Sequence, residues 1–115
     1  MFIKHEAVEP FGFDGLKITD YTAGQDISSS LAEIIVPAGV SHKFSWSKRS
    51  DKYYYIVYGS ITFSVDGDIQ NLTSGDVCIV PKGARFNYTN DGPVDAKLIL
   101  IHTPGFKLDY EVFEE

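Results

Sequence analysis

The feature that most constrains this chain is a series of short segments rich in Val, Ile, Phe and Tyr, each bounded by Gly, Pro, Asn or Asp. Such residues pack well on a pleated sheet. No segment sustains the helical spacing of apolar residues with helix caps. The chain is therefore predicted to be all-β, with strands expected at residues 32–36, 52–58, 61–65, 77–80, 84–88 and 96–102.

Residues 60–72 carry the clearest local signal, a β-hairpin. Residues 61–65 alternate apolar and polar side chains, and the pair Asp66-Gly67 that follows suits a type I′ turn. Six to eight short strands joined by tight turns favour a sandwich, a jelly roll or a small barrel. We choose the barrel-like jelly roll, because closure removes exposed strand edges. Residues 1–28 and 106–115 lack clean alternation, so we expect them to be edge strands or flanking segments that cover the barrel or a partner subunit.

Length and charge exclude several classes of protein. A chain of 115 residues forms one domain with a core that needs no metal or disulfide. The net charge is -6, and the ten Lys and Arg residues are scattered, so we expect no nucleic-acid partner. The single cysteine, Cys78, suits a reducing compartment, and no apolar run approaches a membrane span. We therefore expect a cytoplasmic protein that does not associate with membranes.

Two glycine-anchored segments, residues 39–59 and 75–90, resemble the two motifs of the cupin superfamily. The first family motif reads G, five residues, H-x-H, three or four residues, E, six residues, G. The second reads G, five residues, P-x-G, two residues, H, three residues, N. Both spacings fit without a gap, most specifically at Gly75, Pro81, Gly83 and Asn90. The resemblance implies a double-stranded β-helix, the RmlC-like jelly-roll barrel of a small cupin, as a single domain over residues 1–115 with its motif core at 39–90.

The resemblance also locates the positions where many cupins hold a divalent metal. In those proteins the three histidines and one glutamate of the motifs converge on the ion. Here the four positions hold Ser45, Ser47, Lys52 and Phe86. None is a useful ligand for iron, manganese, nickel or zinc, because Lys carries a positive charge and Phe has no lone pair. We therefore expect no metal and no other cofactor.

If the strand register matches the family, the same residues form a pocket. Lys52 then points into the barrel with the two serines nearby, and two aromatic residues supply apolar wall. An ammonium with hydroxyl groups suits a small anion. The last predicted strand adds a histidine that is able to act as a general base if it faces inward. The candidate ligand-binding residues are Ser45, Ser47, Lys52, Tyr54, Phe86 and His102.

A structural interpretation stays open for each of these residues. Lys52 is also able to pair with Asp51, Glu33 or another acid, or to reach water. Trp46 lies between the two serines, so alternation places it on the opposite face, against flanking segments or a dimer partner. The Tyr53-Tyr54-Tyr55 run places phenols on both faces of one strand.

The histidines and the cysteine carry weaker signals. The spacing of His5, His42 and His102 does not show whether they come together as a shifted metal site. Cys78 lies in an apolar strand, where a thiol is usually buried and inert.

Three functions remain open. The first is a metal-independent, homodimeric cupin that binds a small anionic or sugar-like ligand. The second is a metal-independent enzyme. Phe44-x-Trp46 and the missing motif histidines are similar to ethanolamine-utilisation cupins, which implies acyl-phosphate kinase activity. Sugar isomerases and epimerases of the superfamily use a histidine base and a tyrosine acid, but the motif positions here offer no such histidine. The third function is a structural or assembly role.

Overall fold

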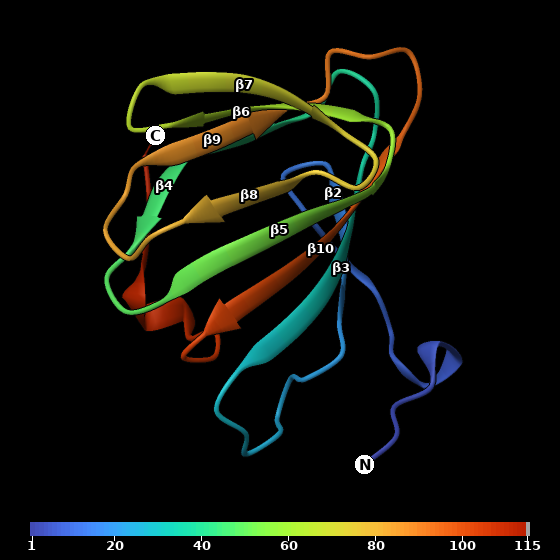
Figure 1. Ribbon diagram of the computed structural model, residues 1–115. Helices are drawn as coiled ribbons and strands as arrows, with labels where there is room; N and C mark the ends of the chain where they lie inside the picture. The colour runs from blue at the N-terminus through green and yellow to red at the C-terminus, as the bar shows by residue number, and fades with distance from the viewer. Residues whose placement is uncertain (115) are drawn as a thin grey trace.

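The computed structural model describes residues 1–114 and consists of two antiparallel β-sheets that face each other (Figure 1). The six-stranded sheet has the order β1 (Phe11–Phe13), β2 (Leu16–Asp20), β3 (Ser30–Val36), β10 (Ala96–Thr103), β5 (Asp51–Tyr58) and β8 (Val77–Val80). The five-stranded sheet has the order β11 (Glu111–Phe113), β4 (Ser41–Ser47), β9 (Phe86–Thr89), β6 (Ser60–Val65) and β7 (Asp68–Thr73). This arrangement confirms the predicted all-β jelly roll.

Helical structure is limited to two short 3-10 helices, η1 (His5–Ala7) and η2 (Leu108–Tyr110). Within residues 1–114, no helix is long and apolar enough to span a bilayer.

The predicted hairpin is confirmed as β6 and β7. Val65 pairs with Asp68 across the turn. Asp66 and Gly67 both have positive φ angles, of 48° and 86°, as a type I′ turn requires.

The other predicted strands are also present, with bounds that differ by at most two residues at either end. Strand β9 begins at Phe86 and not at residue 84, because Ala84 closes a turn by donating its N–H to the Pro81 carbonyl oxygen. Strand β4 was not among the predicted strands. It buries Ser45 and Ser47, which is the reverse of the usual alternation of buried apolar and exposed polar residues.

The two terminal regions form edge strands, as expected. Strand β1 is one edge of the six-stranded sheet and pairs with β2, whereas β11 is one edge of the five-stranded sheet and pairs with β4. The C-terminal segment therefore lies next to β4 at the edge of the five-stranded sheet. This placement brings C-terminal side chains to the barrel interior.

Two motif residues have structural roles that explain why the cupin spacing is kept. Gly59 has a φ angle of +84°, and a Cβ atom there would lie 2.7 Å from the Cα of Ala96, so only glycine fits. The fully buried Asn90 side chain donates to the carbonyl oxygens of Val36 and Val94, at 2.9 and 2.8 Å. It also accepts from Gly92 N–H at 2.9 Å, so one side chain joins a core strand to the loop before β10.

Candidate functional site

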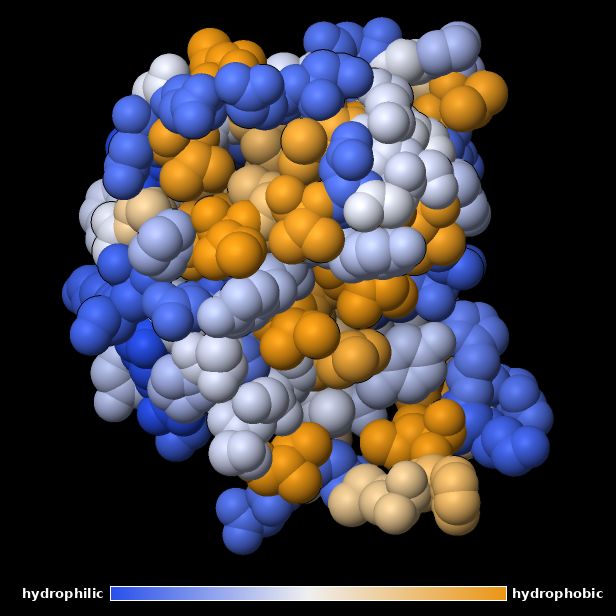
Figure 2. Space-filling model, in the orientation of Figure 1, coloured by the Kyte–Doolittle hydropathy of each residue, from blue (hydrophilic) through white to orange (hydrophobic). Residues whose placement is uncertain are grey.

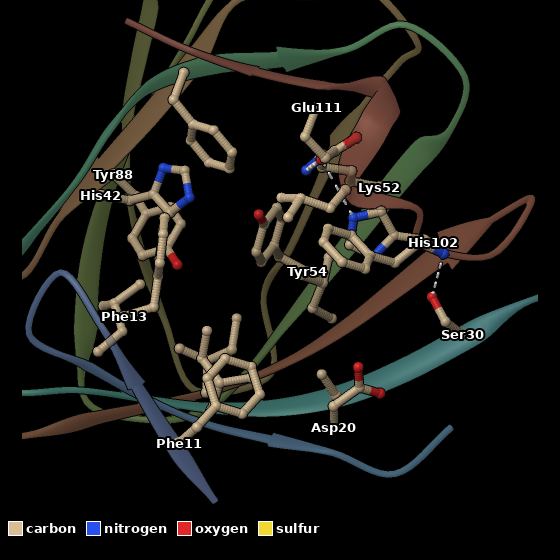
Figure 3. A pocket seen from close by; sticks show the side chains of 18 residues that line it. Phe11, Phe13, Asp20, Ser30, His42, Lys52, Tyr54, Tyr88, His102 and Glu111 are labelled. Atoms are coloured by element: carbon tan, nitrogen blue, oxygen red, sulfur yellow. Dashed lines mark hydrogen bonds and ion pairs between the residues drawn. The ribbon is translucent and has the colours of Figure 1, made fainter. Parts of the chain in front are cut away.

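A cavity of about 340 Å³ lies between the two sheets. Its wall is mostly apolar and aromatic, with Phe11 and Phe13 contributed by β1 (Figure 3). Several polar side chains also face it, and they come from seven different strands or their ends. These polar residues are Asp20, Ser30, His42, Lys52, Tyr54, Tyr88, His102 and Glu111.

Three of the six candidate residues named from the sequence line this cavity. Lys52, Tyr54 and His102 all face it. The other three, Ser45, Ser47 and Phe86, are buried but are not among its lining residues.

Ser47 and Phe86 make contacts within the protein framework, whereas the buried Ser45 hydroxyl has no hydrogen-bond partner among residues 1–114. The Ser47 hydroxyl accepts hydrogen bonds from the backbone N–H groups of Arg49 and Ser50, at 3.3 and 3.0 Å, and so shapes the turn into β5. Phe86 stacks on the His42 ring with a centroid distance of 5.4 Å. Phe86 is therefore a support for a cavity residue.

The Lys52 ammonium forms an ion pair with the carboxylate of Glu111, a residue of the C-terminal strand β11. The pair is almost completely buried, with the two side chains 6% and 3% exposed. Of the partners considered from the sequence, Asp51 instead accepts a hydrogen bond from Lys82 N–H, and Glu33 pairs with Lys97. Lys52 is therefore paired with an acid that the sequence did not single out, Glu111.

Burial and mutual attraction set the charges of this pair. Burial lowers the pKa of Lys52, and the adjacent Glu111 opposes that shift. Burial alone would raise the pKa of Glu111, but the Lys52 ammonium, which is paired with it by charge and by a hydrogen bond, holds that pKa at about 2. Glu111 is therefore ionised at neutral pH and acts as the counter-ion of Lys52.

His102 lies next to this pair on the same side of the cavity (Figure 3). Its Nε2 atom is 3.7 Å from Glu111 Oε1, which is too long for a hydrogen bond, and it has no hydrogen-bond partner among residues 1–114. Burial lowers the pKa of His102, which keeps the ring neutral at pH 7. The ring packs edge-on against Phe106.

His42 and Tyr88 lie together on the opposite side of the cavity (Figure 3). The two residues pair across β4 and β9, and their rings stack with a centroid distance of 5.0 Å. Burial lowers the pKa of His42 to about 4, so the imidazole is neutral. Its Nδ1 atom lies 2.6 Å from the Lys43 carbonyl oxygen and must donate to it. The Nε2 atom is therefore the unprotonated nitrogen, with a free lone pair.

Two tyrosines complete this side of the cavity. Tyr54 and Tyr88 have ring centroids 5.5 Å apart, and both are buried. Burial raises the pKa of each phenol, so both remain protonated donors. The Tyr88 hydroxyl is fully buried and has no hydrogen-bond partner within residues 1–114. A buried, unpaired hydroxyl in a cavity wall is a group that a ligand would satisfy.

The three histidines do not form one site. His5 is exposed and hydrogen-bonds to the Tyr21 hydroxyl at 2.7 Å, whereas His42 and His102 line the cavity. Within residues 1–114, no group of three or more His, Cys, Asp or Glu side chains is placed to hold a metal ion.

The residues at the cupin metal positions do not fit a divalent ion. Lys52 brings an ammonium that is already paired with Glu111, and Phe86 brings a ring stacked on His42. Neither group can coordinate a metal.

Sequence reasoning missed the parts of the site that depend on strand irregularity and long-range contacts. A bulge in β4 shifts the register between His42 and Ser45, so both residues face inward although they are three positions apart. Tyr88 belonged to a predicted strand, but nothing in the sequence showed which face of that strand meets His42. Glu111 lay in the acidic tail, which carried no signal for burial.

Two facing antiparallel sheets that enclose a lined cavity define a barrel protein with an internal cavity. A family model for the cupin domain matches residues 33–102, and the chain belongs to this family. The family resemblance seen in the two glycine-anchored motifs is therefore confirmed.

Two curated proteins share sequence with this chain. Identity is 27% over 97 residues with the endoribonuclease YbeY of Myxococcus xanthus, covering 82% of this chain and 33% of that protein. Identity is 30% over 77 residues with the tetracenomycin polyketide synthase protein TcmJ of Streptomyces glaucescens, covering 67% of this chain and 52% of that protein. The chain thus spans about a third and about half of the lengths of these relatives.

Solved structures show the same fold. Streptomyces Pac13, described as a unique nucleoside dehydratase, superposes with a TM-score of 0.87 at 23% identity, covering 100% of this chain and 91% of that one. Pac13 variants with one histidine changed to glutamine, or one of two tyrosines changed to phenylalanine, have been solved with uridine. KdgF from a Halomonas species superposes with a TM-score of 0.82 at 15% identity, covering 95% and 96% of the two chains. These likenesses establish the shared fold.

Proposed function

We propose that this cupin binds a neutral, sugar-like small molecule in its barrel without a metal ion. The observation that carries the proposal is the buried Lys52–Glu111 ion pair, which removes the free positive charge from an otherwise aromatic cavity. The sequence left an anionic and a sugar-like ligand open. The charges of the residues that line the cavity favour the sugar-like ligand.

The cavity lining carries one ammonium, that of Lys52, and two carboxylates, those of Asp20 and Glu111. An anion entering the cavity would meet this excess of negative charge and would have to compete with Glu111 for the ammonium. The hydroxyl groups of a neutral sugar are able to pair with the unsatisfied Tyr88 hydroxyl and with the free Nε2 atoms of His42 and His102.

Size and shape also support a ligand of this class. A volume of about 340 Å³ lies at the lower end of ordinary ligand pockets, which begin at about 300 Å³. Aromatic walls suit the flat or weakly polar faces of rings. Pac13, which shares the fold, is a nucleoside dehydratase, and its variants were solved with uridine. Uridine is therefore the first neutral probe to test.

Isothermal titration of the chelator-treated protein with uridine tests this proposal. We expect saturable binding that does not change when chelator is present. Tyr54→Phe removes a phenol that lines the cavity, so it should weaken binding, whereas Tyr55→Phe changes the next residue of β5, which is exposed on the outer face. Binding that requires a transition metal, or binding of acetate and phosphate but of no nucleoside or sugar, would contradict the proposal.

The neutral His42 imidazole favours a second candidate function, metal-independent proton transfer on the bound ligand. His42 lines the cavity, and its free Nε2 atom is a base able to remove a proton from a carbon next to a carbonyl group. The C–H bond breaks, an N–H bond forms, and the electron pair moves onto the carbonyl oxygen, where a tyrosine phenol donates a hydrogen bond. Isomerases and epimerases of the superfamily use a histidine base, and His42 is such a histidine outside the motif positions. No residue of the site gives comparable support for a kinase.

Solvent isotope exchange tests the proton-transfer function. Sugars and oxidised nucleosides that carry a carbonyl group are incubated with the protein in deuterium oxide and analysed by mass spectrometry. We expect incorporation of one deuterium, lost in His42→Gln and retained in His5→Gln, which changes an exposed histidine. Uridine binding without any exchange would contradict the proton-transfer function and leave the binding proposal intact.

A homodimer, predicted from the sequence, remains a proposal that the outer face of the six-stranded sheet supports. Figure 2 shows apolar side chains gathered over β8, β5 and β10 on this face. Its exposed apolar residues are Tyr53, Tyr55, Val77, Ile79 and Ile101. Because each copy carries a net charge of -6, an uncharged patch is where two copies approach with the least repulsion.

Light scattering tests the homodimer. We expect twice the chain mass of 12.8 kDa, and a return to that single mass in an Ile79→Lys variant. A monomer at all concentrations would contradict the dimer and leave the cavity proposal unaffected.

A further inference from the structure

We propose that Glu111 decides the charge of the ligand that the barrel accepts. Its carboxylate occupies the Lys52 ammonium as an internal counter-ion, so that neutral molecules enter the cavity and anions are rejected. Removal of this one negative charge would convert the cavity into an anion site. The inference rests on the proposed function, because it explains how the same cavity selects a neutral ligand.

The first step of the argument is that Lys52 is able to bind an anion once its partner is gone. Among the residues that line the cavity, Lys52 is the one Lys or Arg. Its side chain is 6% exposed, and its ammonium lies 5.1 Å from the centroid of the Phe86 ring. A buried ammonium with no counter-ion is costly, so an incoming carboxylate or phosphate would be bound in place of Glu111.

The second step is that Glu111 is held in position independently of Lys52. Strand β11 pairs with β4, where Glu111 lies opposite Ser47. The Lys48 N–H donates to the Tyr110 carbonyl oxygen at 2.8 Å, and Glu114 N–H donates to the Phe44 carbonyl oxygen at 2.8 Å.

Outside the cavity, Arg85 donates two hydrogen bonds to the Glu114 carboxylate, at 2.6 and 2.7 Å. These contacts keep β11 docked when the Glu111 side chain is altered. A Glu111→Gln variant therefore changes the charge in the cavity and keeps the strand that carries it.

The third step is that no other acid replaces Glu111. Asp20 lines the cavity, but its Oδ1 atom accepts from the backbone N–H and the hydroxyl of Thr22, at 3.1 and 3.4 Å. Asp51, the neighbour of Lys52 in β5, accepts from Lys82 N–H. The charge balance at the ammonium thus depends on one side chain near the C-terminus.

Titration calorimetry at pH 7 with acetate, inorganic phosphate and uridine tests the inference. The wild-type protein should bind uridine and show no measurable affinity for acetate or phosphate. Glu111→Gln should bind at least one of the two anions, with an affinity at least tenfold above the wild-type limit. The double variant Lys52→Met with Glu111→Gln should lose that anion binding again, because it removes the ammonium.

Glu114→Gln is the matched control, since it alters a glutamate of the same C-terminal segment that pairs outside the cavity. It should leave the affinities for acetate and phosphate unchanged. Should Glu111→Gln prove unstable, phosphate is expected to raise its melting temperature by several degrees and that of the double variant not at all.

The inference is overturned if folded Glu111→Gln shows wild-type affinity for both anions, or if an unstable Glu111→Gln gains no stability from phosphate. Those outcomes leave uridine binding by the wild-type protein intact. Loss of uridine binding in the wild-type protein would instead refute the proposed function, whatever the variants do with anions.

Discussion

The neutral state of the buried His42 predicts that the protein loses stability as the pH falls from 7 to 5. Burial lowers the pKa of His42 from 6.5 to about 4 in the folded protein. The unfolded chain therefore binds the proton more tightly throughout this interval. By linkage, the free energy of unfolding decreases as the pH falls through 6.5 and levels off below 4.

The size of the effect follows from the same shift. A difference of 2.5 pKa units corresponds to about 3.4 kcal/mol in total, and about 2 kcal/mol of it is lost between pH 7 and pH 5. His102, whose pKa burial also lowers, acts in the same direction. The lowered pKa of Glu111, about 2, contributes only below its unfolded value near 4.5, so the interval from 7 to 5 reports on the histidines.

Urea unfolding, followed by the fluorescence of Trp46, measures the free energy of unfolding at pH 7 and at pH 5. His42→Phe keeps a ring that is able to stack on Phe86 and Tyr88, and it removes the titrating group. We expect the pH-dependent loss to shrink by about 2 kcal/mol in this variant. His5→Gln, which changes an exposed side chain, should behave as the wild type. A full wild-type pH dependence in His42→Phe would refute the reasoning.

Three further predictions concern the scaffold. Gly59→Ala should lower the free energy of unfolding by about 2 kcal/mol or more, because it adds a clash with Ala96 to an unfavourable φ angle. Gly67 has a similar φ angle and open space around it, so Gly67→Ala should lower the free energy of unfolding by less in the same urea titration. Equal losses in the two variants would show that the clash at Gly59 is absent. Asn90→Ala removes three hydrogen bonds of a fully buried side chain and should lower the unfolding free energy by about 3 kcal/mol, with a loss below 1 kcal/mol arguing against the role described. Burial raises the pKa of the Cys78 thiol to about 11, so its reaction with a disulfide reagent at pH 8 should be at least 100-fold slower in the folded protein than in urea, and equal rates would contradict its burial.

Local patterns in the sequence were sufficient to predict most of the scaffold. Alternation of apolar residues and the Asp66-Gly67 pair identified the hairpin, because both signals depend only on neighbouring residues. The spacing of the motifs identified the family, because Gly59 and Asn90 occupy places where no other residue meets the steric or hydrogen-bonding demand. Four residues stand at the motif positions that hold a metal in many cupins, and all four, Ser45, Ser47, Lys52 and Phe86, are buried.

The composition of the cavity could be predicted only in part. Lys52, Tyr54 and His102 were found because regular alternation places them inward. His42 faces the cavity because of a bulge, which alternation does not reveal. Glu111 enters it because an acidic tail docks as an edge strand, and that contact spans 59 positions of the chain. The placement of His42 and Glu111, the two residues on which our proposals rest, thus depends on tertiary structure.

A crystal structure of the protein grown with uridine tests the central claim most directly. We predict density for the nucleoside between the side of the cavity formed by His42 and Tyr88 and the side formed by Lys52 and Glu111, with the ion pair intact and a hydrogen bond to the Tyr88 hydroxyl. A metal ion coordinated inside the barrel, or an anion on Lys52 with Glu111 displaced, would contradict it.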